Sequence, residues 1–179
     1  MKKQTPKTLI SIAAIAAVLS GPAGPISSAT ASGPETSTSA KGVLGQTLTA
    51  SIGNIPLPAD KTTDVTVSGK GYGLKTGIYV TYCVVPQKGK KPDHCGAYNP
   101  TGINSQAHWI SSNPPLYAVL LVKKFGKGGT FKVTLPISST IGDYDCTKVK
   151  CAILTRADHT NPSYRKADVI IPVTFKQGE

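Results

Sequence analysis

The segment Thr130–Ile137 (TFKVTLPI) has an apolar residue at every second position, with Lys132 and Thr134 between them. Successive side chains of a β-strand point to opposite faces, so this period predicts a strand with one buried face. Ala167–Phe175 repeats the pattern. Five further runs predict strands: Gln46–Ile52, Thr63–Ser68, Gly77–Val85, Leu116–Lys123 and Lys150–Thr155.

Turn sequences separate these runs. They include Gly69–Gly71, Gly126–Gly129 and Asn161–Ser163, all of which contain glycine or proline. About seven short strands with turns at this rate are typical of a two-sheet sandwich. We therefore predict an all-β protein with an immunoglobulin-like two-sheet sandwich of about seven strands.

The four cysteines form two local pairs, Cys83 with Cys95 and Cys146 with Cys151. An even number of close-set cysteines in an exported chain indicates disulfides. The alternative, a metal site, is disfavoured because neither Cys-x11-Cys nor Cys-x4-Cys is the usual zinc spacing. We predict two local disulfide bonds and no bound metal.

Residues 1–31 have the features of a secretory signal peptide: a basic start, the apolar stretch Leu9–Leu19, and the small-x-small sequence Ala29–Ala31. The apolar stretch is about half the ~20 residues that span a bilayer, which leaves an uncleaved anchor as the alternative. We predict cleavage after Ala31 and a secreted or extracytoplasmic cell-envelope location. Residues 32–42 are then a flexible leader, and residues 43–179 form the sandwich domain.

The chain is basic, with a formal net charge of +11, which falls to +8 without the three lysines of residues 1–31. Such a charge attracts anionic lipid headgroups, acidic wall polymers or acidic protein surfaces, although a merely solvated face is the alternative. Nucleic acid is not an expected partner, because aromatic residues do not alternate with the lysines. The lysines predicted to form a basic surface are Lys88, Lys90, Lys91, Lys123, Lys124 and Lys127.

Catalytic patterns are missing from the sequence. It has no Gly-x-Ser-x-Gly elbow, no His-Glu-x-x-His and no phosphate-binding loop, and its three histidines stand far apart. We therefore expect no catalytic residues, no cofactor and no enzyme activity.

Two motifs point to a known family: Val65–Cys83 (VTVSGKGYGLKTGIYVTYC) and Asp145–Cys151 (DCTKVKC). Together they resemble the neocarzinostatin-type apoproteins, immunoglobulin-like sandwiches that carry enediyne chromophores. The resemblance implies the same sandwich and a cleft for a small apolar ligand. The chain also resembles a group of actinobacterial secreted cell-envelope proteins, some of which carry haem-uptake domains. No haem-uptake domain fits in this chain, so haem binding is not expected.

The chain departs from the chromophore carriers at two places. Only Ser138–Tyr144 stands where the carriers have a long aromatic hairpin, and Gly96–Pro115 resembles an insertion. A loop of this length without periodicity is often functional, and it contains the only tryptophan of the chain. Tryptophan is over-represented at binding hot spots. Our candidate binding residues are Trp109, His108, Tyr98 and Tyr117, although Trp109 could instead pack this loop onto a sheet.

Two functions follow from these observations. The first is a non-catalytic envelope module that binds an envelope or membrane protein partner or an anionic envelope surface. The alternative is a carrier of a small apolar ligand. A deep cleft near Trp109, Tyr98 and the Cys83–Cys95 loop would favour the carrier, whereas a flat basic and aromatic face would favour the interaction module.

Overall fold

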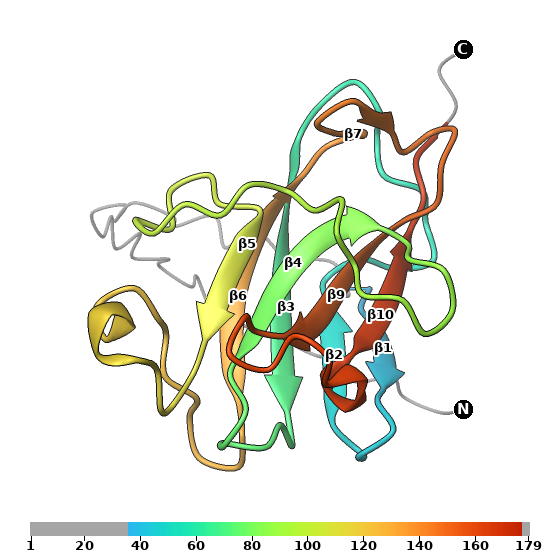
Figure 1. Ribbon diagram of the computed structural model, residues 1–179. Helices are drawn as coiled ribbons and strands as arrows, with labels where there is room; N and C mark the ends of the chain where they lie inside the picture. The colour runs from blue at the N-terminus through green and yellow to red at the C-terminus, as the bar shows by residue number, and fades with distance from the viewer. Residues whose placement is uncertain (1–35, 177–179) are drawn as a thin grey trace, which may run out of the picture. The chain divides into compact units, whose positions relative to one another are not determined.

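The computed structural model describes residues 36–176, which fold into two four-stranded antiparallel sheets (Figure 1). The first sheet has the order β1 (Thr38–Lys41), β2 (Thr47–Ala50), β3 (Thr63–Lys70) and β6 (Phe131–Ile137). The second has the order β10 (Val169–Val173), β9 (Cys151–Ala157), β4 (Ile78–Val84) and β5 (Ala107–Ile110). The remaining elements are the hairpin strands β7 (Thr140–Ile141) and β8 (Tyr144–Asp145) and the 3-10 helices η1 (Leu116–Ala118) and η2 (Arg165–Ala167).

The predicted all-β sandwich class is confirmed. Six of the seven expected strands are present as β2, β3, β4, β6, β9 and β10. The predicted signal peptide lies outside the described residues. Within residues 36–176, no helix is both long and apolar enough to cross a membrane.

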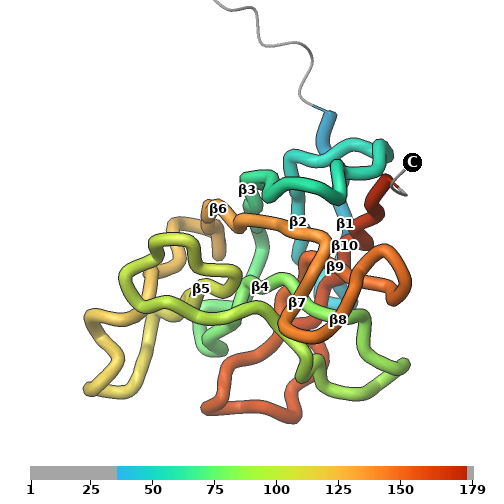
Figure 2. Tube along the Cα trace, turned by 90° about the horizontal axis from the view of Figure 1, so that it is seen from above, coloured from blue at the N-terminus to red at the C-terminus, as the bar shows by residue number. Residues whose placement is uncertain are grey.

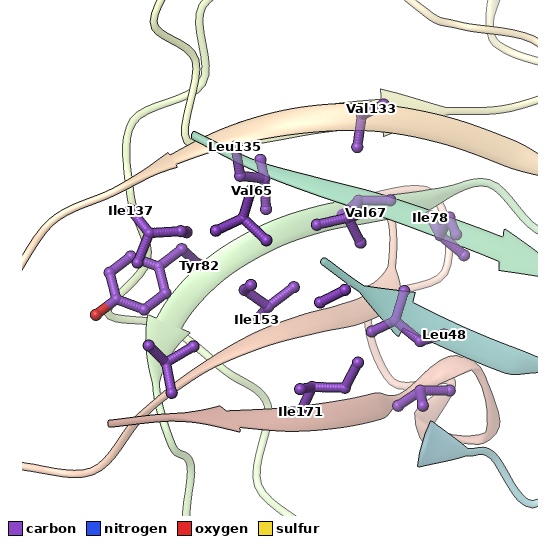
Figure 3. Packing of buried hydrophobic residues seen from close by; sticks show 14 of the residues in the cluster. Leu48, Val65, Val67, Ile78, Tyr82, Val133, Leu135, Ile137, Ile153 and Ile171 are labelled. Carbon is purple, nitrogen blue, oxygen red and sulfur yellow. The ribbon is translucent and has the colours of Figure 1, made fainter. Parts of the chain in front are cut away.

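The core lies between the two sheets, where apolar side chains from both meet (Figure 3). Val65 and Leu135 from the first sheet and Ile153 and Ile171 from the second are fully buried. The burial of β6 alternates as its sequence predicts, with Lys132 on the outer face. Complete burial of each such aliphatic side chain contributes about 1.5–3 kcal/mol.

The second sheet is also buried on its outer face. Thr81, Trp109 and Leu154 point away from the core and are nevertheless at most 4% exposed. The segment after β4 returns to the same sheet, where Cys95 forms a β-bridge with Cys83 of β4 and Tyr98 forms one with Ala107 of β5. These bridges extend the sheet along its β5 edge, and the cleft described below lies on the outer face.

Both predicted disulfides are present, Cys83–Cys95 and Cys146–Cys151, and the chain has no free cysteine. The first joins the segment after β4 back to that strand, and the second closes the loop between β8 and β9. Disulfides of this kind are typical of exported proteins.

Three expectations about the elements need correction. Leu116–Lys123 is not a strand: it contains η1 and a turn, because Leu116 and Leu120 remain 92% and 95% exposed and face no sheet. The segment Gly96–Pro115 is not a loop throughout, since it contains β5, which pairs with β4. Residues 38–41 of the expected leader form β1, held by its pairing with β2.

Candidate functional site

A cleft of about 350 Å³ opens on the outer face of the second sheet. Its lining combines aromatic rings, small residues and two cations, and it has no carboxylate. The lining residues are Tyr79, Thr81, Lys91, Cys95, Gly96, Tyr98, Ala107, Arg156, His159 and Pro162. Pockets with a few convergent polar groups on apolar walls are the usual form of small-ligand sites.

Strand register builds the centre of this cleft. Tyr79 of β4 stands opposite Trp109 of β5 and opposite Arg156 of β9. Residues in register across a sheet share one face, so the three side chains form a row. The Tyr79 and Trp109 rings are 5.8 Å apart, and the Arg156 guanidinium lies 5.0 Å from the centre of the Tyr79 ring.

A hydrogen-bonded chain of three side chains forms one wall. His159 Nδ1 lies 2.7 Å from the Tyr79 hydroxyl, and its Nε2 lies 2.8 Å from the Tyr117 hydroxyl. A neutral imidazole donates from one nitrogen and accepts at the other. One tyrosine therefore accepts from His159 and keeps its own hydroxyl proton free for another acceptor. The arrangement leaves a hydrogen-bond donor available for a ligand.

The buried carboxylate of Asp158 holds the residues of this wall in place. Its Oδ2 accepts a hydrogen bond of 2.8 Å from Trp109 Nε1, and its Oδ1 accepts from the amide and hydroxyl of Thr160. The carboxylate is 1% exposed. Gly77 is required beside it, because a Cβ at residue 77 would lie 2.0 Å from Asp158 Oδ2. Asp158 therefore positions both the indole and the loop that carries His159.

Electrostatics in the cleft favour an anionic group. Arg156 is partly buried, and within residues 36–176 no carboxylate lies within ion-pair distance of it and its Nε has no hydrogen-bond partner. Burial lowers the pKa of Arg156, which reflects the cost of desolvating its charge. Burial, followed by the charge of Asp158, raises the pKa of Tyr79 to about 12, so this hydroxyl stays protonated.

Other cavities have a different character. One of about 460 Å³ beside Cys146–Cys151 has mainly apolar walls that include Ile170 and Phe175. Another of about 470 Å³ lies under the Lys90–His94 loop. Neither brings several aromatic rings together with a partly buried cation, so the cleft at Tyr79 is the preferred candidate site. Within the described part of the chain, no group of three or more His, Cys, Asp or Glu side chains could hold a metal ion.

Three of the four binding residues predicted from the sequence come together. Tyr98 lines the cleft with its ring 6.5 Å from that of Tyr79, Tyr117 binds His159, and Trp109 is 4% exposed behind them. Trp109 is thus a buried support and not an exposed recognition residue.

His108 does not join this cluster. Neighbouring strand residues face opposite sides, so it points towards the first sheet, where its Nε2 lies 2.9 Å from the Thr134 carbonyl. Burial lowers its pKa.

Sequence reasoning did not select Tyr79, Arg156, Asp158 or His159 as site residues. The period of two along a strand places Tyr79 and Arg156 on the face opposite the core, but β4 and β9 are buried at nearly every position and show no regular polar–apolar alternation, so the signal was weak. The six expected surface lysines are all exposed, but they occupy two loops that lie far apart in both views, the yellow-green one after β4 and the gold one after β5 (Figures 1 and 2).

No protein-family model matches the chain, and no curated protein matches it. A solved structure of macromomycin is similar, with 18% sequence identity, a TM-score of 0.42, and coverage of 67% of this chain and 90% of that chain. At this identity and TM-score the likeness carries no conclusion, and the disulfide-bonded, two-sheet fold rests on the strands and bonds described above.

Proposed function

We propose that the protein is a non-catalytic carrier that holds a small, planar, largely apolar ligand with an anionic group in the cleft at Tyr79. The observation that carries the proposal is the row of Trp109, Tyr79 and Arg156 across three strands, in which Tyr79 and Arg156 line a cavity of about 350 Å³ and the buried Trp109 supports Tyr79. Aromatic walls favour a flat ligand, and the partly desolvated Arg156 guanidinium, which no carboxylate of residues 36–176 approaches to ion-pair distance, favours an anion.

The remaining groups fit this chemistry. The Tyr79–His159–Tyr117 chain offers a hydroxyl donor, and Lys91 adds a second positive charge at the lining. The disulfide Cys83–Cys95 holds in place the segment that carries the lining residues Cys95, Gly96 and Tyr98, which lowers the entropy lost when a ligand binds. The interaction with an envelope protein partner, expected first from the sequence, stays a prediction.

The test uses the exported chain from Ser32 onward and the aromatic sulfonate 8-anilinonaphthalene-1-sulfonate as the probe. Fluorescence titration should give saturable binding. Arg156→Gln should weaken this binding by about tenfold, the range for one charge-assisted hydrogen bond. Tyr79→Phe should weaken it less, because the ring remains.

The matched control is Lys132→Gln, which removes the same charge from an exposed position on the first sheet. Its binding should equal that of the wild type. The proposal fails if the wild type does not bind the probe saturably, or if Arg156→Gln and Lys132→Gln have equal effects. If the proposal survives this test, organic extraction of protein purified from its native source, followed by mass spectrometry, would identify the natural ligand.

A further inference from the structure

The segment 116–121 (LYAVLL) presents apolar side chains to water. Leu116 and Leu120 are 92% and 95% exposed, and Val119 and Leu121 are also exposed. The segment, gold in Figures 1 and 2, protrudes from the side of the domain next to β5. Single exposed leucines are common, but a contiguous apolar patch of this kind marks an interaction site.

The fold holds these leucines outward. Ala118 is buried, the Tyr117 hydroxyl lies 2.8 Å from His159 Nε2, and the Leu121 carbonyl accepts a hydrogen bond of 2.7 Å from the Tyr98 hydroxyl. At the end of the segment, Lys123 donates its amide to the Trp109 carbonyl. The base of the loop is therefore fixed while its largest apolar side chains point away from the protein.

Positive charge lies close to the apolar tip in the sequence. Lys123, Lys124 and Lys127 follow it directly and are exposed. The sequence from His94 to Gly142 has no aspartate or glutamate. Apolar side chains next to a cluster of lysines are the pattern of a segment that enters an anionic membrane surface. Protein interfaces are instead depleted in lysine, and leucine is rare among their hot spots.

We propose that this segment, which we call the leucine loop (116–121), inserts into the interface of an anionic lipid bilayer, with Lys123, Lys124 and Lys127 at the headgroups. This inference goes beyond the carrier function and does not depend on it. The two features are nevertheless adjacent, because Tyr98 and His159 both line the cleft and hold the leucine loop. Insertion would place the cleft beside the membrane surface.

The test is a vesicle flotation assay on the exported chain from Ser32 onward. This chain includes both disulfides and every described strand. Mixed phosphatidylglycerol–phosphatidylcholine vesicles should bind the protein, and pure phosphatidylcholine vesicles should bind it far less. Leu116→Ser/Leu120→Ser should lower the partition coefficient at least about tenfold. The matched control is Leu44→Ser/Ile55→Ser, which alters two exposed apolar residues elsewhere and should bind like the wild type.

A second measurement locates the inserted residue. In Leu120→Trp, the new indole should shift its emission to shorter wavelength when anionic vesicles are added, whereas the spectrum of wild-type Trp109, already buried, should not change. The proposal would be overturned if the wild type did not bind anionic vesicles, or if the serine double variant bound them equally well. It would also be overturned if the wild type did not bind vesicles but self-associated, and the double variant did not self-associate, because the leucine loop would then be a protein interface. The double variant should still bind the naphthalene sulfonate probe, so failure here is distinguishable from failure of the carrier function.

Discussion

Replacement of Trp109 tests whether the cleft is built on a buried support. The indole is 4% exposed, contacts the Tyr79 and His159 rings at centroid distances of 5.8 and 4.8 Å, and donates a hydrogen bond to Asp158. Removal of a buried aromatic side chain costs about 3–5 kcal/mol. Trp109→Ala should therefore lower the free energy of unfolding by that amount, in contrast to the small loss that an exposed recognition residue would give.

Trp109→Phe separates the two contributions to this loss. Phenylalanine keeps most of the ring contacts but leaves Asp158 Oδ2 without its indole donor. A lost hydrogen bond to a buried charged group costs about 1.5–3 kcal/mol. The phenylalanine variant should thus lose roughly half of what the alanine variant loses.

The assay is equilibrium urea unfolding under non-reducing conditions, followed by far-ultraviolet circular dichroism, because the variants lack the only tryptophan. An unchanged slope against urea would confirm that stability, and not the denatured state, has changed. The reasoning is refuted if Trp109→Ala costs less than about 1 kcal/mol, or if the phenylalanine and alanine variants are equally destabilised.

Two further predictions concern stability. Replacing both cysteines of either disulfide by serine should lower the free energy of unfolding in urea by about 2–3 kcal/mol, with the larger loss for the longer Cys83–Cys95 loop. A crossed pairing in non-reducing peptide maps would contradict the assignment of the disulfides. Burial raises the pKa of Asp168 to about 6 against the opposing charges of Arg165 and Arg156. Because the raised pKa favours the protonated carboxyl in the folded state, its contribution to stability is present below about pH 4 and is lost as the pH rises through about 6. As the pH rises from about 4 to about 6, the unfolding free energy of the wild type should fall by on the order of 2 kcal/mol relative to that of Asp168→Asn. The unfolding free energy of the exposed control Asp64→Asn should change with pH as that of the wild type does.

Much of the fold could be predicted because β-strands carry their burial pattern locally. The alternation in Thr130–Ile137 gives the faces of β6 correctly, and the close spacing of the cysteines gives both disulfides. Prediction failed where the apolar pattern did not report burial. Leu116–Lys123 has strand-like residues, but only its last residue, Lys123, bridges a strand, and β5 is too short to show a period.

The sequence by itself determined six of the strands, their inward faces and the local cross-links, because each depends on residues close together in the chain. Only the tertiary structure decided which outward residues would form a site. The pairing of β4 with β5 and β9 aligns Tyr79, Trp109 and Arg156, which are far apart in sequence, and the same pairing turns His108 to the other face. Alternation divides a strand into two faces, but whether the outer face meets solvent or other parts of the chain depends on long-range contacts. The contact of Tyr117 with His159 is one of these, since it joins the leucine loop to the cleft.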